Sequence, residues 1–173
     1  MPKKEIARLD RIALCTTTED NLGIVIKMER DSNNIPFIRQ WSEQKHRAAI
    51  ANADIAHLII QAISDSRIIG YVILIGLENP DESIEFKRIV IGEKGEGFGR
   101  EAVRLVKKYA FEIRGAHRLW LEVIENNYRA YRLYKSEGFV SEGVHRESLK
   151  QGDTFLSLRV MSMLAGEYRH CSE

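Results

Sequence analysis

The stretch that decides the fold covers residues 89–100 and reads Ile-Val-Ile-Gly-Glu-Lys-Gly-Glu-Gly-Phe-Gly-Arg. An apolar run ends at Ile91 and a long amphipathic segment begins near Arg100, so the three glycines between Lys94 and Arg100 lie where a strand passes into a helix. Glycine leaves room for a ligand and adopts positive φ, and the first N–H groups of a helix carry partial positive charge. These features are typical of a loop that binds phosphate.

Spacing separates this loop from other phosphate-binding loops. The P-loop requires Gly-x-x-x-x-Gly-Lys followed by Ser or Thr, and the chain contains no such string. The Rossmann pattern Gly-x-Gly-x-x-Gly fails because Arg100 stands where the third glycine is required. What remains is a basic residue, two spacers, glycine, one spacer and glycine, at Lys94, Gly97 and Gly99.

A second motif follows at residues 127–139, which read Asn-Tyr-Arg-Ala-Tyr-Arg-Leu-Tyr-Lys-Ser-Glu-Gly-Phe. The first motif resembles the acetyl-coenzyme A (acetyl-CoA) loop of the GNAT N-acetyltransferase superfamily, Gln/Arg-x-x-Gly-x-Gly/Ala, with Lys94 replacing Gln or Arg. The second resembles that family's later cofactor helix, Asn-x-x-Ala-x-x-x-Tyr-x-x-x-Gly-Phe. The sequence around both motifs is most similar to the spermidine N-acetyltransferases and the ribosomal-protein alanine N-acetyltransferases. The motifs do not decide between these two branches.

Composition limits the other classes of function. The chain has 173 residues, 44% of them apolar, so we expect one domain over residues 1–173. Lys and Arg number 26 against 25 Asp and Glu, which gives no general basic field for nucleic acid or an anionic membrane. The apolar stretch 68–77 is too short to span a bilayer, and no apolar signal segment opens the chain, so the expected location is the cytoplasm.

Cysteine and histidine give no metal signature. Cys15 and Cys171 lie near opposite ends of the chain without the spacing of a zinc site, and the five histidines are scattered singly. We therefore expect neither a metal nor a structural disulfide, and we read the histidines as surface or packing residues.

Hydrophobic periodicity and turn residues predict the element order β-α-α-β-β-β-α-β-α-β-β. The expected strands cover residues 11–17, 56–64, 68–77, 83–91, 118–124, 139–145 and 155–163. The expected helices cover residues 18–31, part of 37–51, 98–113 and 127–136. The resemblance implies the GNAT acyl-CoA N-acyltransferase fold, an α/β (α+β) mixed sheet whose strands at 83–91 and 118–124 splay into a V-shaped cleft.

The resemblance also implies which residues bind acetyl-CoA. The loop N–H groups would hold the diphosphate, and the exposed backbone of strand 83–91 would pair with the pantetheine amides as with an added strand. The expected cofactor-binding residues are Ile89, Val90, Ile91, Lys94, Gly95, Glu96, Gly97, Phe98, Gly99, Arg100, Asn127, Ala130 and Tyr134.

Two side chains are candidates for catalysis. Tyr134 occupies the tyrosine position of the second motif, where its hydroxyl would protonate the leaving thiolate as general acid; the alternative is a packing aromatic. Glu85 is the candidate base for the acceptor ammonium, acting through water; the alternative is a surface carboxylate paired with Lys87 or Arg88. By period 2, Glu85 and Lys87 should share one strand face with Ile89 and Ile91.

The acceptor is open at this point. By resemblance, segments 20–51 and 148–154 would select it. Four acidic residues in or near the first of these segments could bind a polycation or form a solvated face: Glu29, Asp31, Glu43 and Asp54. Phe37 and Trp41 would line the acceptor pocket or anchor a helix.

The expected function is acetyl transfer from acetyl-CoA to a primary amine in a ternary complex. The amine would be a polyamine, a protein N-terminus or another small amine. The alternative is a non-catalytic acyl-CoA-binding sensor, which would not need Tyr134. We expect no nucleic-acid or membrane partner. An exposed final strand over residues 155–164 could pair two copies into a homodimer.

Overall fold

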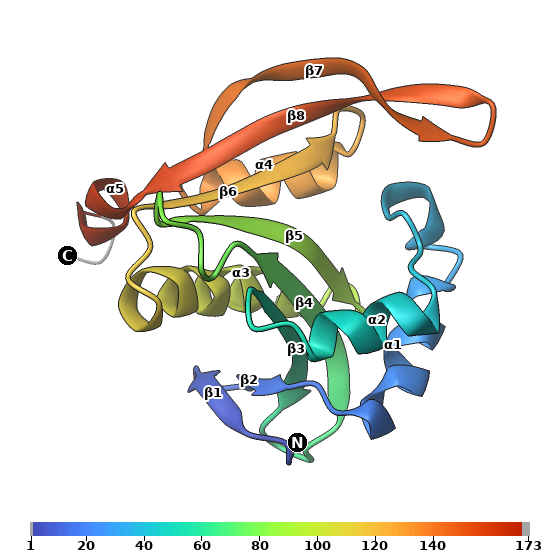
Figure 1. The fold of residues 1–173 in the computed structure, drawn as a ribbon, viewed down its shortest axis with the longest axis vertical. Helices are drawn as coiled ribbons and strands as arrows, with labels where there is room; N and C mark the ends of the chain where they lie inside the picture. The colour runs from blue at the N-terminus through green and yellow to red at the C-terminus, as the bar shows by residue number, and fades with distance from the viewer. Residues whose placement is uncertain (1, 171–173) are drawn as a thin grey trace.

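A computed structural model describes residues 2–170, except for the side chains of residues 169 and 170 (Figure 1). Cys171 lies outside the described residues. The strands are β1 (Glu5–Arg8), β2 (Ile12–Thr16), β3 (Ile55–Ala62), β4 (Ile68–Ile75), β5 (Ser83–Ile91), β6 (Arg118–Ile124), β7 (Val140–Gln151) and β8 (Thr154–Leu164). The helices are α1 (Leu22–Glu29), α2 (Glu43–Ile50), α3 (Phe98–Lys108), α4 (Tyr128–Ser136) and α5 (Ala165–His170), with short 3₁₀ turns at Glu19–Asn21 and Ile35–Phe37.

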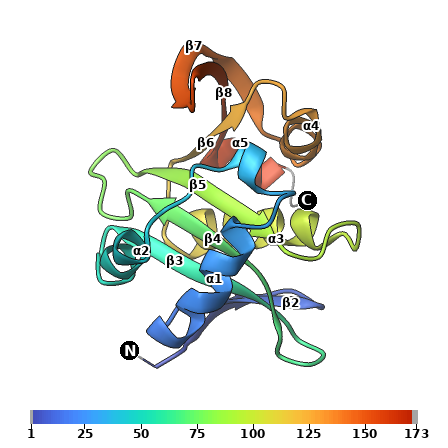
Figure 2. The same cartoon turned by 90° about the vertical axis from the view of Figure 1, so that its right-hand side faces the viewer.

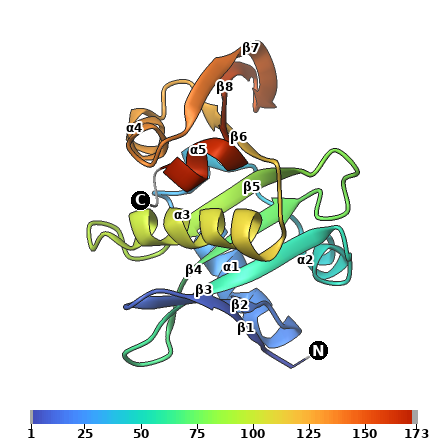
Figure 3. The same ribbon diagram turned by 90° about the vertical axis from the view of Figure 1, so that its left-hand side faces the viewer.

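All eight of these strands join one mixed sheet in the order β1-β2-β3-β4-β5-β6-β8-β7. Helix α3 covers one face, and α1 and α2 cover the other (Figures 2 and 3). The inner side of α3 is fully buried at Ala102, Val103, Leu105 and Val106. Burying a Val or Leu side chain contributes roughly 1.5–3 kcal/mol, so this face fixes the helix, and the loop before it, against the sheet.

Strands β5 and β6 run parallel but pair only at their first residues. Ser83 to Glu85 pair with Arg118 to Trp120, and beyond that point β6 continues its pairing with β8 instead. The two strands diverge in Figure 1. The edge of β5 from Phe86 onward therefore faces a gap with no partner strand among the described residues, as the V-shaped cleft requires.

A β-bulge at Lys87 changes which face each side chain of β5 occupies. Ile73 on β4 pairs with Arg88, whereas the next residue, Leu74, pairs with Phe86, so Lys87 is the extra residue. Phe86 packs on the α3 side with Ile89 and Ile91, while Val90 packs on the α1 and α2 side. The predicted shared face was therefore wrong, because the bulge puts Glu85 on the face opposite Ile89 and Ile91.

Several elements differ from the prediction at the ends of the chain. The short strand β1 and the final helix α5 were not predicted, and the last turn of the predicted helix 98–113 is a π-helix over Tyr109–Ile113. Strand β7 extends to Gln151 and pairs with β8, which also pairs with β6. The final strand is thus not the free edge proposed for dimerisation, since β7 is the outer strand.

No described helix is long and apolar enough to cross a membrane. Within residues 2–170, His, Cys, Asp and Glu side chains form no group of three or more arranged to hold a metal ion. Cys15 is a buried free thiol.

Candidate functional site: two cavities that meet at Tyr134

The glycine loop presents free backbone donors at the start of α3. Gly97 is the N-cap residue and adopts φ 82°, a left-handed conformation that favours glycine. Its carbonyl oxygen accepts from the N–H groups of Arg100 and Glu101, at 3.1 and 3.4 Å. No acceptor among the described residues takes the N–H groups of Gly97, Phe98 or Gly99. These donors, at the positive end of a helix, suit a diphosphate.

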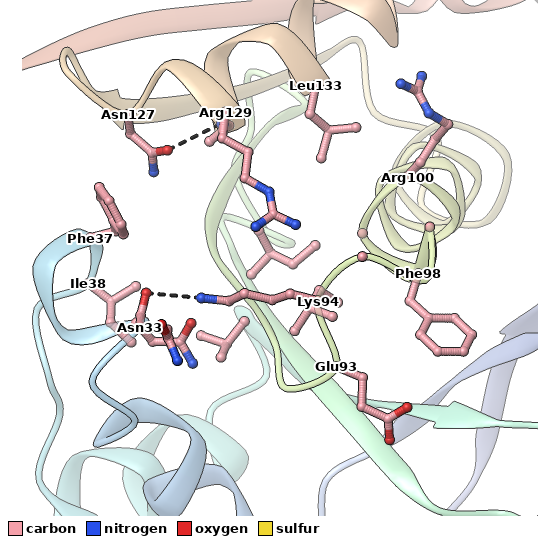
Figure 4. A pocket seen from close by; sticks show the side chains of 18 of the residues that line it. Asn33, Phe37, Ile38, Glu93, Lys94, Phe98, Arg100, Asn127, Arg129 and Leu133 are labelled. Carbon is pink, nitrogen blue, oxygen red and sulfur yellow. Dashed lines mark hydrogen bonds between the residues drawn. The ribbon is translucent and has the colours of Figure 1, made fainter.

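A cavity of about 460 Å³ lies beside this loop, between β5, α4 and the segment that joins α1 to α2. Figure 4 shows Lys94 from the loop and Arg129 from α4 pointing into the space between them. Lys94 Nζ donates to the carbonyl oxygen of Asn33 at 3.0 Å, and partial burial lowers the pKa of Lys94. Two cations beside free N–H groups make this cavity suited to phosphates.

Most of the predicted cofactor-binding residues come together on this cavity's wall: Ile89, Val90, Ile91, Lys94, Gly95, Gly97, Phe98, Gly99, Arg100, Asn127, Ala130 and Tyr134. Glu96 does not line it; its carbonyl oxygen accepts from Arg11 Nη2 at 3.0 Å. The Arg100 guanidinium donates to Glu137 Oε1 at 2.6 Å and to Ser136 Oγ at 3.0 Å. In this arrangement Arg100 ties α3 to the end of α4.

Helix α4 begins at a side-chain cap and carries Tyr134 inward. Asn127 Oδ1 accepts from the N–H of Ala130 at 3.2 Å, so this side chain caps the helix. The Tyr134 ring makes edge contacts with Phe86 and Phe139, at centroid distances of 6.1 and 5.7 Å. Burial raises the pKa of Tyr134, and its hydroxyl has no hydrogen-bond partner within residues 2–170. Tyr134 therefore keeps its proton at neutral pH.

A second cavity, of about 380 Å³, adjoins the first. The two share six lining residues: Phe37, Ile38, Ile89, Asn127, Ala130 and Tyr134. Glu85, Lys87, Trp41, Lys45 and Leu149 also line the second cavity. Both segments expected to select the acceptor thus contribute to it. Glu85 Oε1 accepts from Lys87 Nζ at 2.9 Å, which is the pairing foreseen in its alternative, structural role.

A buried polar cluster supports the second cavity from behind. The Arg88 guanidinium donates to Glu29 Oε1 and to the carbonyl oxygen of Arg39. Glu29 also accepts from Tyr71 Oη at 2.5 Å and from the Trp41 N–H at 2.9 Å. Glu29 is 1% exposed, so both roles offered from sequence, polycation binder and solvated face, were wrong. Its segment folds inward because Arg88 compensates the charge.

Two histidines continue this cluster. His46 Nε2 lies 3.2 Å from Glu29 Oε1, His46 Nδ1 lies 3.0 Å from His57 Nε2, and His57 Nδ1 lies 2.9 Å from Thr17 Oγ1. The two ring contacts fit when the Thr17 hydroxyl donates to His57 and His57 donates to His46. His46 Nε2 then faces Glu29 Oε1 without the alignment of a hydrogen bond. The packing role predicted for these two histidines is confirmed.

The pKa values follow from this arrangement. Burial alone would raise the pKa of Glu29, but the nearby His46 ring, the Tyr71 hydroxyl, the Arg88 charge and the Trp41 N–H lower it to about 2. Burial, followed by repulsion from His46 when charged and from Arg88, lowers the pKa of His57 to about 3. At physiological pH the cluster therefore holds an ionised Glu29, a charged Arg88 and a neutral His57 ring.

Sequence reasoning missed several residues of the first cavity, Arg129 and Leu133 on α4 and Asn33 and Asn34 after α1. The helical period could have indicated Leu133, because it lies three residues after Ala130 on one face. Arg129 occupies an unspecified position of the second motif. Asn34 is held by its own side chain, whose Nδ2 donates to the Met28 carbonyl oxygen at 2.8 Å.

Comparison with known proteins gives the family. The profile of the acetyltransferase (GNAT) family matches residues 25–139. A spermidine N(1)-acetyltransferase of Vibrio cholerae is 32% identical over 111 residues, which cover 64% of each chain. A spermidine N(1)-acetyltransferase of Escherichia coli is 28% identical over 120 residues, again covering 64% of each. The match thus spans about two thirds, 64%, of the length of these curated relatives.

Solved structures show the same fold. Spermidine N-acetyltransferase from Vibrio cholerae in complex with CoA and spermine superposes with a TM-score of 0.82 at 23% identity, covering 91% of this chain and 98% of that one. The likeness confirms the predicted fold, and the short pairing of β5 with β6 in this chain gives the predicted splay. With both motifs on the wall of one cavity and the family profile across 25–139, this chain belongs to the acetyltransferase (GNAT) family.

Proposed function

We propose that this protein is an acetyl-CoA-dependent N-acetyltransferase that acts on a primary amine by direct attack in a ternary complex. The observation that carries the proposal is the meeting of two cavities at Tyr134. One cavity has the free donors and cations that suit a nucleotide diphosphate, and the other reaches the same tyrosine from a different side. Two substrates could then contact each other beside one buried hydroxyl.

The residues of the first cavity fit acetyl-CoA, which supplies the acetyl group as a thioester. The N–H groups of Gly97, Phe98 and Gly99 would hold the diphosphate, with Lys94 and Arg129 neutralising its charge. The unpaired edge of β5 at Ile89, Val90 and Ile91 would bind the pantetheine amides, and an N–H there would polarise the acetyl carbonyl.

Tyr134 would act as general acid. The amine nitrogen forms a bond to the acetyl carbon, the carbon–sulfur bond breaks, and the Tyr134 hydroxyl gives its proton to the departing sulfur before regaining one from solvent. Its raised pKa keeps that proton in place until the thiolate forms. The free hydroxyl supports this role, because an acid already bonded to another group would be less available.

Glu85 would act as general base and accept the proton of the acceptor ammonium through a water molecule. An alkyl ammonium has a pKa near 10, so it must lose a proton before attack at neutral pH. Glu85 lines the second cavity and lies on the strand face that carries Arg88. Its contact with Lys87 would have to loosen when the amine binds.

The test is thiol release from acetyl-CoA by the purified protein across a panel of amines: spermidine, spermine, aminoglycosides, amino acids, and peptides beginning with alanine, serine or methionine. Release that depends on an amine, with a product heavier by one acetyl group, supports the proposal. Tight acetyl-CoA binding without turnover on any amine would instead support a non-catalytic acyl-CoA sensor.

Cytoplasmic location and a homodimer belong to the same proposal. The outer strand β7 replaces β8 as the edge that could pair between copies. Light scattering after size exclusion measures the assembly directly.

A further inference from the structure

We infer that the acceptor amine carries an anionic group, a carboxylate or phosphate, and that Lys45 and Arg39 bind it. The inference rests on the proposed function and names the substrate class of the second cavity. The observation behind it is the charge balance of that cavity's wall, which holds four cations, Arg39, Lys45, Lys87 and Arg88, against two carboxylates, Glu85 and Glu122.

The carboxylates around this cavity already have side-chain partners within the protein. Glu85 pairs with Lys87 at 2.9 Å, and Glu122 Oε1 lies 3.1 Å from His145 Nδ1. Glu29, behind the wall, is paired with Arg88. Because Arg88 is bonded to Glu29 and to a backbone carbonyl, its charge is compensated inside the protein and is not offered to a ligand.

Lys45 and Arg39 are the two cations of the cavity wall whose charge no carboxylate compensates in the part of the chain that the structure describes. Neither lies within ion-pairing distance of a carboxylate among residues 2–170. Lys45 Nζ lies 4.3 Å from the centre of the Trp41 ring, and the Arg88 guanidinium lies 4.8 Å from the same centre. Trp41 thus holds Lys45 at the cavity wall. A wall with two uncompensated cations attracts an anion and repels a polycation.

Spermidine is a poor fit for such a wall. Its amines have pKa values near 10, so those that do not react remain charged at pH 7. Acidic residues do occur past Glu85, where Asp54, Glu78 and Asp81 line a further hollow that shares Glu85 with the second cavity. Asp54 Oδ1 is engaged by the Glu78 N–H at 2.8 Å, and this hollow reaches neither Tyr134 nor Trp41. We therefore expect the cations beside Tyr134 to dominate acceptor choice.

The test compares acceptors that differ only in charge. Values of kcat/KM are measured for β-alanine against β-alaninamide and for the dipeptide Ala-Glu against Ala-Gln, with O-phosphoethanolamine as the phosphate probe and spermidine as the polycation. We expect at least one acid to exceed its amide by tenfold or more, and the better of carboxylate and phosphate to identify the anion. Equal rates for acids and amides, or spermidine as the fastest acceptor, would overturn the inference.

Variants assign the effect to residues. Lys45→Met keeps an apolar stem against Trp41 and Arg39→Gln keeps polarity; each should raise KM for the acid at least fivefold and leave KM for the amide within twofold. Arg47→Gln removes the same charge from α2 but lies outside the cavity, where Arg47 pairs with Glu43 and Glu19. This control should change neither KM. An equal loss in all three variants would indicate a general charge effect and contradict the assignment.

A binding measurement separates failure of the inference from failure of the proposed function. In a Trp120→Phe background, Trp41 is the remaining tryptophan, so its fluorescence reports the cavity wall. Succinate or inorganic phosphate, added with saturating CoA, should shift that fluorescence saturably, and Lys45→Met should weaken the shift at least fivefold. If no amine is acetylated but this shift occurs, the anion site stands without the enzyme activity. Saturation by spermidine alone would overturn the anion site.

Discussion

Arg88 and Glu29 form an ion pair inside the protein, 59 residues apart in the chain, with side chains that are 5% and 1% exposed. The pair joins the end of α1 to the middle of β5, directly behind the wall of the second cavity. It also positions Trp41, whose N–H donates to Glu29 and whose ring lies against Arg88. The acceptor side of the site therefore depends on a charge pair whose two side chains are almost fully buried.

Removing the Glu29 charge should destabilise the fold strongly. Glu29→Gln leaves Arg88 buried without a counter-charge, which costs roughly 3–5 kcal/mol of unfolding free energy. Urea denaturation measures the loss. Glu43→Gln breaks an exposed pair with Arg47 and should cost less than about 1 kcal/mol. Comparable losses of unfolding free energy for the two variants would show that the buried pair contributes no more stability than an exposed one.

Acid should weaken the protein through His57. Its pKa in the folded state is lowered from 6.5 to about 3, so between these values the unfolded chain binds a proton that the folded chain does not. The stability that His57 contributes is complete above pH 6.5 and is lost as the pH falls toward 3, at up to about 1.4 kcal/mol per pH unit.

Unfolding free energies between pH 7.5 and 5 test this window, which lies above the range where Glu29 titrates. His57→Gln should flatten the slope, while His117→Gln, at an exposed histidine, should leave it unchanged. A slope that survives in His57→Gln would assign the effect to other groups.

Gly97→Ala should weaken acetyl-CoA binding. An alanine at φ 82° costs about 1–2 kcal/mol, and this strain favours a different loop conformation. The new Cβ would also lie 3.3 Å from Arg11 Nη2, so that side chain would have to move slightly. We expect KM for acetyl-CoA to rise at least fivefold. Gly115 also has positive φ, at 68°, but lies outside the cavity, so Gly115→Ala should cost stability without changing KM. An unchanged KM in Gly97→Ala would mean that the loop donors do not hold the diphosphate.

Glu85→Gln should slow acetylation in a pH-dependent manner. If Glu85 is the general base for the ammonium proton, kcat/KM of the variant should fall roughly 10- to 100-fold at pH 7. This deficit should shrink as the pH approaches the amine's own pKa, because the amine then loses its proton without the base. Initial rates from pH 6.5 to 9.5 give the profile. Lys87→Gln removes the partner of Glu85, and any deficit in its kcat/KM should not shrink as the pH rises. A deficit that stays constant with pH would assign Glu85 a structural role.

Much of the fold could be predicted because glycine and helix periodicity are local signals. Gly97 and Gly99 located the loop, and the resemblance of residues 127–139 to the family's cofactor helix indicated Asn127, Ala130 and Tyr134. Most of the first cavity's wall followed from these two motifs. The Lys87 bulge could not be predicted, because it is a property of the pairing between β4 and β5. The burial of Glu29 depends equally on Arg88, a distant residue, and an isolated Met-Glu-Arg sequence reads as surface.

The strands at the two ends of the sheet were harder to predict from sequence for a related reason. Strand β7 is largely exposed and polar, so its pairing with β8 comes from hydrogen bonds that leave little hydrophobic pattern. Strand β1 has only four residues, and one of them is buried. Neither β1 nor the unpredicted second half of β7, residues 146–151, carries enough apolar periodicity to distinguish a strand from a loop.

The most direct test of the account is thiol release by wild type and Tyr134→Phe, with acetyl-CoA binding measured by calorimetry on both proteins. Tyr128, which is 66% exposed on the same helix, supplies the matched control Tyr128→Phe. We predict that Tyr134→Phe loses about 100-fold or more in kcat, binds acetyl-CoA within threefold of wild type, and that Tyr128→Phe behaves as wild type. Wild-type kcat in Tyr134→Phe would contradict the assignment of Tyr134 as the acid that protonates the departing thiolate.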